Sequence, residues 1–198
     1  FEAIAASGRK VAMIGIENGY VIGKELSRLE EFYNMGARYM TLAHNGHNDI
    51  CDSSGPLARL GDVEEEHGGV SNFGYQVIDE MNRVGMMVDI SHVSIKCMMQ
   101  ATKYSKAPVI ASHSGVWELA KHSRNLNDEQ LMAIGAAGGV VQIVGLNSFV
   151  KFYPDKGSEI SIIRNAAALA AGDKPMDSII RTRQRGSTGS DEDWVKVG

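Results

Sequence analysis

Apolar runs and helically spaced apolar residues alternate along the chain. The continuous apolar runs suit strands that are buried on both faces, and they occur at residues 10–16, 38–42, 86–90, 108–111 and 139–144. The segments between them predict helices at residues 24–35, 71–83, 94–104, 116–121 and 127–137. Strands that alternate with helices in this order predict an α/β fold with a parallel sheet.

Residues that favour helix ends mark several of these boundaries. Gly36 supplies a C-terminal stop for the first helix. Ser71 and Ser94 are N-cap residues for the next two helices, and Asn127 opens the last one. The capping residues and the apolar spacing therefore predict the same elements.

The fold expected from this order is a TIM-type (β/α) barrel of which only part is present. A complete eight-stranded barrel usually takes about 250 residues, whereas this chain of 198 residues shows five clear strands. A polar stretch at residues 44–69 has turn residues but no periodicity, and loops of that length are usually functional or disordered. We assign residues 1–157 to the barrel portion and residues 158–198 to a helix, at 159–171, with a polar tail.

Four of the apolar runs lead to a polar side chain of a kind that binds metal or charge. The runs VAMIGI, YMTLA, MMVDIS and PVIAS lead to Glu17, His44, His92 and His113 respectively. Because the carboxyl ends of parallel strands meet at one rim of a sheet, we expect these side chains to lie close together. Two neutral imidazoles and a carboxylate form a zinc ligand set found in hydrolases. The sequence therefore predicts a metal site formed by Glu17, His92 and His113.

Each of these residues also has a structural interpretation. Glu17 precedes Asn18 and Gly19 and could be a loop carboxylate beside a turn. His92 and His113 could each be a histidine that is hydrogen-bonded near a helix cap. Repetition favours the metal site, because independent caps need not fall at matching points of successive βα units, whereas the ligands of one ion must converge.

The other histidines carry no such expectation. His47 lies in a loop rich in Gly and Asn and is interpreted as part of a solvated turn. His67 follows a run of three glutamates that indicates an exposed face, and His122 resembles a histidine at a helix end. The sequence has no Gly-x-Ser-x-Gly motif and no glycine-rich phosphate-binding motif, which argues against a serine hydrolase and a nucleotide-binding protein.

Composition and charge narrow the choice of partner. The chain is 43% hydrophobic and 22% charged, which is ordinary for a soluble globular domain. The formal charge is −4, and the lysines and arginines form no basic stripe along the sequence. A small-molecule substrate therefore fits better than nucleic acid. No apolar stretch reaches the roughly 18 residues of a membrane helix. Cys51 and Cys97 are too few and too far apart in sequence for a disulfide framework.

Five motifs together resemble the membrane dipeptidase, or renal dipeptidase, family. They are GIENG at 15–19, RYMTLAHN at 38–45, GMMVDISH at 85–92, PVIASHS at 108–114 and RNL at 124–126. Their length, order and spacing make the match specific, and it covers roughly residues 10–153. The resemblance implies a zinc-dependent (β/α) barrel that hydrolyses dipeptides at a binuclear zinc centre and often accepts a D-residue at the carboxyl end.

The resemblance also implies a role for each matching residue. Glu17 would bridge the two zinc ions, and His92 and His113 would complete the ligands of one of them. His44 would contact the substrate near the scissile carbonyl and stabilise its developing oxyanion. Arg124 would hold the terminal carboxylate of the substrate. A hydroxide would attack the carbonyl, because zinc lowers the pKa of bound water to about 7.

Two parts of the family's pattern have no clear counterpart. The family's first strand carries a His-x-Asp pair for the second zinc, and that strand is expected upstream of Phe1. The late aspartate that assists proton transfer follows a later strand. Asp191, in the sequence GSDED at 189–193, resembles it superficially, but no buried strand precedes it. The motifs of this chain thus support one zinc ion of the family's two.

Three functional hypotheses stay open. The first is an active zinc-dependent dipeptidase, and the second is an incomplete, catalytically inactive barrel that binds at most one zinc ion. The third is a related metal-dependent amidohydrolase that acts on a non-peptide amide. The family's habit of dimerising makes a homodimer the expected state, and the compartment stays open between cytoplasm, periplasm and secretion.

Overall fold

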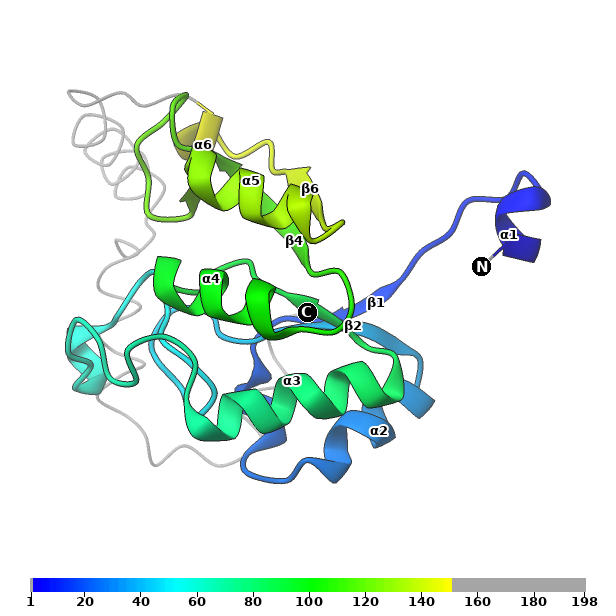
Figure 1. Ribbon diagram of the computed structural model, residues 1–198, viewed down its shortest axis with the longest axis horizontal. Helices are drawn as coiled ribbons and strands as arrows, with labels where there is room; N and C mark the ends of the chain where they lie inside the picture. Colours follow the sequence, from blue (N-terminus) through cyan, green and yellow to red (C-terminus); the bar gives the residue numbers. More distant parts are fainter. Residues whose placement is uncertain (1, 151–198) are drawn as a thin grey trace, which may run out of the picture. The chain divides into compact units, whose positions relative to one another are not determined.

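A parallel sheet connects the main elements of the computed structural model, which describes residues 2–150 (Figure 1). Its strands are β1 (Ile14–Ile16), β2 (Ala37–Thr41), β3 (Met87–Asp89), β4 (Ile110–Val116), β5 (Asn125–Leu126) and β6 (Val140–Ile143). β1, β2, β3 and β4 are neighbours in chain order, and both β5 and β6 pair with β4. All of these pairings are parallel. The predicted α/β fold with part of a (β/α) barrel is confirmed.

Four helices cover the sheet in chain order. They are α2 (Ser27–Asn34), α3 (Asn72–Val84), α4 (Ile95–Tyr104) and α5 (Asp128–Ala136). Each packs against the next, so the helices form one layer (Figure 1). The shorter helices are α1 (Glu2–Ala6), α6 (Asn147–Val150) and the 3-10 turns η1 (Gly19–Ile22) and η2 (Ala58–Leu60).

The predicted caps are confirmed at three helices. The side chain of Ser71 accepts a hydrogen bond from Gly74 N, and that of Ser94 accepts one from Cys97 N. Asn127 and Gln130 form a reciprocal capping box at the start of α5. These bonds satisfy amides that the helix itself leaves without acceptors, so local sequence fixes where each helix begins.

One hydrophobic core fills the space between helices and sheet. The strands contribute side chains such as Met40 and Val88, which are at most 2% exposed. The helices contribute fully buried residues, namely Leu29, Val77, Ile78, Met81, Met98 and Ile134. Their positions on α3, at intervals of one, three and four residues, explain why that segment forms an amphipathic helix.

Two sequence predictions differ from the structure. The helix predicted at 116–121 is wrong, because β4 continues to Val116 and a turn follows it. The side chain of Asn125 holds this turn, since its Nδ2 donates to the carbonyl oxygens of Val116 and Ala120, at 3.3 and 2.7 Å. The strand β5 that begins at Asn125 adds a sixth strand to the five that were expected.

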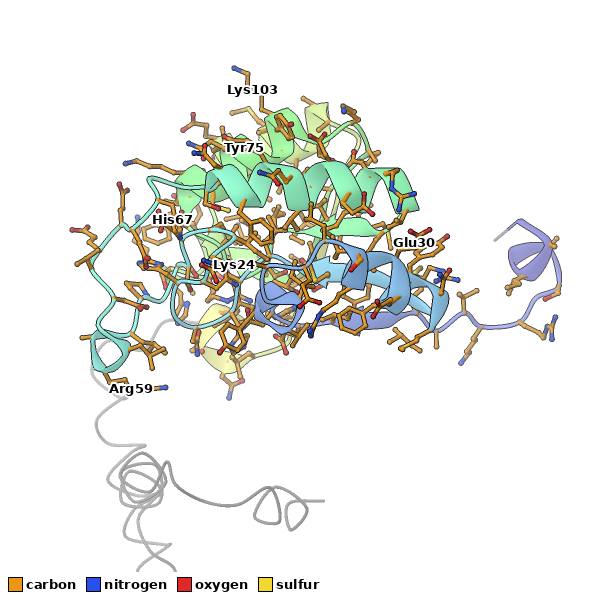
Figure 2. All side chains as sticks on the ribbon, turned by 90° about the horizontal axis from the view of Figure 1, so that it is seen from below. Lys24, Glu30, Arg59, His67, Tyr75 and Lys103 are labelled. Atoms are coloured by element: carbon orange, nitrogen blue, oxygen red, sulfur yellow. The ribbon has the colours of Figure 1, made fainter. Side chains whose placement is uncertain are left out.

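The segment at 44–69 is an ordered loop built around the buried carboxylate of Asp52. Oδ1 of Asp52 accepts from Glu66 N and His67 N, both at 3.0 Å, and Oδ2 accepts from Gly69 N at 2.8 Å. Burial alone would raise the pKa of Asp52, but these three amides lower it overall. Figure 2 shows Arg59 and His67 on this loop, at the end where α3 begins.

The interpretation of His47 as part of a solvated turn is wrong, because its side chain is fully buried. Its Nδ1 accepts a hydrogen bond from Ser53 N at 2.9 Å, and its Nε2 lies 2.9 Å from Val63 O. His47 is therefore a structural residue of the loop.

The strands β1 and β6, each of which pairs with one other strand, expose apolar side chains. Ile14 of β1 is 60% exposed and Ile143 of β6 is 63% exposed. The expected homodimer stays a prediction.

Among residues 2–150, no helix is long and apolar enough to cross a bilayer.

The chain divides into two units, residues 1–152 and 153–198, and every element described here belongs to the first. The domain boundary predicted at residue 157 stays a prediction. The helix predicted at 159–171 and the candidate Asp191 lie outside the described residues.

Candidate metal centre

One carboxylate oxygen lies within reach of three imidazole nitrogens at the carboxyl ends of the strands. Oε1 of Glu17 is 3.0 Å from Nε2 of His113, 3.2 Å from Nε2 of His92 and 3.5 Å from Nε2 of His44. The Nε2 atoms of His92 and His113 are 2.9 Å apart. The structure thus brings together all four side chains that the apolar runs predicted to converge.

Successive βα units place these side chains. Glu17 follows β1 directly, and His44 and His92 each lie three residues beyond the end of β2 and β3. His113 lies within β4, where the pairing with β6 is irregular between Ala111 and Ser114. The predicted strand at 108–111 is therefore longer than expected and carries its ligand candidate inside it.

The donor set fits a divalent metal ion. Glu17, His44 and His92 offer one ligand atom each, all within 4.8 Å of one another. The atoms of Glu17, His92 and His113 are closer still, at 2.9–3.2 Å. Ligands about 2.0–2.1 Å from a tetrahedral zinc ion lie roughly 3.3 Å apart, which is close to these separations. Without a cation or a shared proton, three such acceptor atoms would repel one another.

His92 is the most buried of the three imidazoles. Its side chain is 10% exposed, against 30% for His113 and 37% for His44. Burial is the main cause that lowers the pKa of His92 to about 3, and the charge of Arg124 lowers it further. His92 is therefore neutral at neutral pH, which is the protonation state that a metal ligand requires.

The loop at 44–69 holds the backbone of two of these histidines. Ser54 N donates to the carbonyl oxygen of His92 at 2.7 Å, and the Ser53 hydroxyl donates to the carbonyl oxygen of His44. His92 has a φ of 69°, a left-handed conformation that only a few per cent of residues other than glycine adopt. The loop supplies the hydrogen bonds that fix this strained residue in place.

A second contact from the same loop supports the neighbour of Glu17. Nδ2 of Asn48 donates to Oδ1 of Asn18 at 3.0 Å and to the carbonyl oxygen of Leu42 at 2.9 Å. Asn18 has a φ of 93°, so the chain turns sharply just after Glu17. Asn48 thus ties the end of β1 to the segment that leads to His44.

Arg124 lies beside the candidate centre as a buried cation. It is 7% exposed, and its Nη2 donates to the carbonyl oxygen of His113 at 3.0 Å. Burial lowers its pKa to about 10, while Asp89 and Glu17 act in the opposite direction. Among the described residues, no carboxylate forms a direct ion pair with Arg124.

Sequence reasoning did not find the residues that support the centre. Ser53 and Asn48 lie in the loop at 44–69, outside the five motifs, whereas Asp89 lies inside the motif at 85–92 without having been singled out. The one available signal was Asp89, a carboxylate at the end of an otherwise apolar run. His67 and His122 lie outside the centre. Nε2 of His67 lies 2.8 Å from the carbonyl oxygen of Asn48, and Nδ1 of His122 accepts from Arg124 N at 3.1 Å, so both act as structural histidines.

Comparisons with known proteins agree with the motifs. A family model described as membrane dipeptidase, peptidase family M19, matches residues 1–184. An uncharacterized dipeptidase of Schizosaccharomyces pombe is 38% identical over 169 residues, which are 84% of this chain and 39% of that protein.

Solved structures show the same relationship. The probable dipeptidase PvdM of Pseudomonas aeruginosa aligns with a TM-score of 0.73 at 30% identity, over 88% of this chain and 43% of that one. A metallo peptidase of Rhodobacter sphaeroides, liganded with a phosphinate mimic of the dipeptide L-Ala-D-Ala, aligns with a TM-score of 0.62 at 25% identity, over 76% of this chain and 42% of that one. The chain spans about two fifths of the length of these relatives.

Proposed function

The chain belongs to the membrane dipeptidase family, peptidase family M19, and from this membership we propose that it carries a zinc site for the hydrolysis of dipeptides. The observation that carries the proposal is the convergence of Glu17 Oε1 on the Nε2 atoms of His92 and His113. Zinc is the proposed ion because two imidazoles and a carboxylate are its usual ligands in hydrolases.

We assign the metal to Glu17, His92 and His113 and leave His44 for the substrate. His44 is the farthest of the three imidazoles from Glu17 and the most exposed. An exposed imidazole at the edge of the centre can donate a hydrogen bond to the carbonyl oxygen of a peptide as negative charge develops there. A bound zinc ion would supply a Lewis acid that polarises the carbonyl and lowers the pKa of water to about 7.

Arg124 is the proposed partner of the substrate's terminal carboxylate. Its buried guanidinium has no ion-pair partner among residues 2–150, although it lies near the centre. A buried cation without a counterion is stabilised when a carboxylate approaches. A guanidinium can bind a carboxylate through two hydrogen bonds. This contact would select a substrate with a free carboxylate close to the scissile bond, which is a dipeptide. The mimic bound by the Rhodobacter enzyme makes L-Ala-D-Ala a suitable substrate for the test.

A second candidate is a chain that binds one zinc ion and has no turnover. Its support is that the described residues contain one group of converging ligands, which includes Glu17.

Zinc content and hydrolysis together separate the candidates. The full chain is loaded with zinc, freed of excess metal and analysed for zinc per chain, and the release of alanine from L-Ala-D-Ala is measured. We expect bound zinc and hydrolysis in the parent chain, and the loss of both in His113→Ala. His67→Gln is the matched control, because it removes an imidazole outside the centre and should retain both. One zinc ion without hydrolysis supports the second candidate, and a chain that binds no zinc refutes both.

A further inference from the structure

A series of hydrogen bonds runs from the buried Asp89 through the partly exposed Ser112 to His113. The Ser112 hydroxyl lies 2.5 Å from Oδ2 of Asp89 and 2.7 Å from Nδ1 of His113. We propose that Asp89 and Ser112 are positioning residues that hold His113 as the Nδ1–H tautomer, so that the lone pair of Nε2 points at the metal position. Which ring nitrogen of His113 carries the hydrogen is a property of the zinc-free chain. Its effect on metal affinity rests on the proposed function.

The direction of the hydrogen bonds follows from counting hydrogens. Asp89 is fully buried, and its Oδ1 accepts from Ser91 N at 2.9 Å and Ser112 N at 3.1 Å, two groups that can only donate. Its Oδ2 accepts from the hydroxyl of Thr41 at 2.8 Å and from that of Ser112. A hydroxyl has one hydrogen, and Ser112 gives it to the carboxylate. Towards His113 the Ser112 oxygen can therefore act only as an acceptor, so Nδ1 of His113 must carry the hydrogen.

The other ring nitrogen of His113 then has the property that a ligand needs. A neutral imidazole has one donor and one acceptor nitrogen, so a hydrogen on Nδ1 leaves the lone pair on Nε2. Nε2 of His113 is the atom that lies 3.0 Å from Oε1 of Glu17 and 2.9 Å from Nε2 of His92. In the opposite tautomer, a hydrogen on Nε2 would occupy the direction in which a cation must bind.

His113 is also fixed at its backbone by the same group of residues. Its amide donates to Oγ of Ser91 at 3.1 Å, and its carbonyl oxygen accepts from Nη2 of Arg124 at 3.0 Å. Ring and backbone are thus held by separate contacts, so removing the Ser112 hydroxyl should release the ring without displacing β4. Partners of this kind typically change metal affinity by 10–100-fold when they are removed.

His92 provides a contrast within the same centre. Its Nδ1 is buried and has no hydrogen-bond partner among the described residues, whereas its carbonyl oxygen accepts from Ser54 N at 2.7 Å. The backbone therefore positions His92, and a side-chain relay positions His113. A substitution of Ser112 should change the tautomer of His113 and leave His92 as it is.

Ser112→Ala is the variant that tests the relay, because it leaves the three other donors to Asp89 in place. Ser112→Thr restores a hydroxyl at the same position and is the rescue variant. Ser114→Ala is the matched control: Ser114 lies on the same strand, and its buried hydroxyl has no partner in the described part of the chain. Asp89 is a poor target, since its loss would leave several buried donors without acceptors.

The first measurement is nitrogen NMR of the histidine rings in the full-length, zinc-free chain at pH 8, above the ordinary imidazole pKa of about 6.5. We expect His113 to be the Nδ1–H tautomer in the parent chain, in Ser112→Thr and in Ser114→Ala, and to show the Nε2–H tautomer in Ser112→Ala. An Nε2–H tautomer of His113 in the parent chain overturns the proposal, whether or not any variant folds.

The second measurement is the dissociation constant of zinc, determined by competition with a chelator. We expect Ser112→Ala to weaken binding about 10–100-fold, Ser112→Thr to recover most of that loss and Ser114→Ala to equal the parent chain. Equal affinity in Ser112→Ala and the parent overturns the link between relay and metal. A chain with the expected tautomer that fails to hydrolyse dipeptides counts against the proposed function alone, so the two failures are distinguishable.

Discussion

Replacing Gly74 with alanine should destabilise the protein, although the same change usually stabilises a helix. Gly74 lies in the first turn of α3, where the helix meets the loop at 44–69. A Cβ at this position would lie 2.1 Å from the carbonyl oxygen of Ile50 and 2.8 Å from Cγ1 of Val70. That oxygen cannot move away freely, because it accepts a hydrogen bond from Ser71 N at 2.9 Å.

One stabilising and two destabilising contributions set the change in the free energy of unfolding. Alanine in place of glycine stabilises a helix by up to about 1 kcal/mol. Overpacking a buried contact costs about 1–3 kcal/mol, and the loss of the hydrogen bond between Ser71 and Ile50 costs about 0.5–1.5 kcal/mol more. We therefore expect Gly74→Ala to lower the free energy of unfolding by about 2 kcal/mol, which corresponds to roughly 4–8 °C in Tm for a chain of this size.

Gly135 provides a matched control in α5. A Cβ there meets nothing within 4 Å, and its φ is not positive. Gly135→Ala should therefore stabilise the protein by about 0.4–1 kcal/mol. The assay is urea unfolding of the zinc-free chain, followed by far-UV circular dichroism, with equal m values in all three proteins. If both variants shift the urea midpoint in the same direction, α3 does not pack against Ile50 closely enough to exclude a Cβ at position 74, and the reasoning is refuted.

Three further predictions concern single groups. Asp52→Asn should lower the free energy of unfolding by about 1–3 kcal/mol, because three amides lose a charged acceptor, and urea unfolding at pH 7 measures this. Asn127→Ala removes one half of a capping box and should cost about 1 kcal/mol in the same assay; equal stability would contradict the observed cap. His92 has a pKa lowered to about 3, so between pH 7 and pH 5 its imidazole takes up a proton in the unfolded chain but stays neutral in the folded chain. The zinc-free protein should therefore lose about 1–2 kcal/mol between pH 7 and pH 5, and His92→Asn should flatten that slope.

The sequence was sufficient for the parts of the fold that depend on near neighbours. The helix α3 has its cap at Ser71, its apolar stripe at Val77, Ile78 and Met81, and its end at Gly85, all within one segment. Each of these signals favours the same helix, so the pattern predicts it within two residues. The four convergent side chains were predictable for a related reason, since each follows an apolar run in the same position of a repeating unit.

The local pattern misses structure that a single side chain holds by hydrogen bonds to the backbone. The turn after β4 reads as a helix from its spacing, but Asn125 satisfies its carbonyl oxygens with a side-chain amide. The stretch at 44–69 is the aperiodic loop that the sequence predicts, but its order was not foreseen: Asp52 accepts the amide hydrogens of Glu66, His67 and Gly69. No local pattern reveals which side chain will provide such an acceptor.

The candidate centre combines both kinds of information, which is why its ligand candidates were predictable and its supports were not. A ligand must lie at the rim, and the end of a strand in the sequence marks that place. A support can come from any segment that passes within hydrogen-bond distance, as Ser54 does for His92 and Ser112 does for His113. Since these two supports belong to different parts of the chain and act on different groups, the loop can be loosened without releasing the ring of His113. The geometry of the centre therefore depends on two separable sets of contacts, and the set that the loop at 44–69 provides lies outside the ligand motifs.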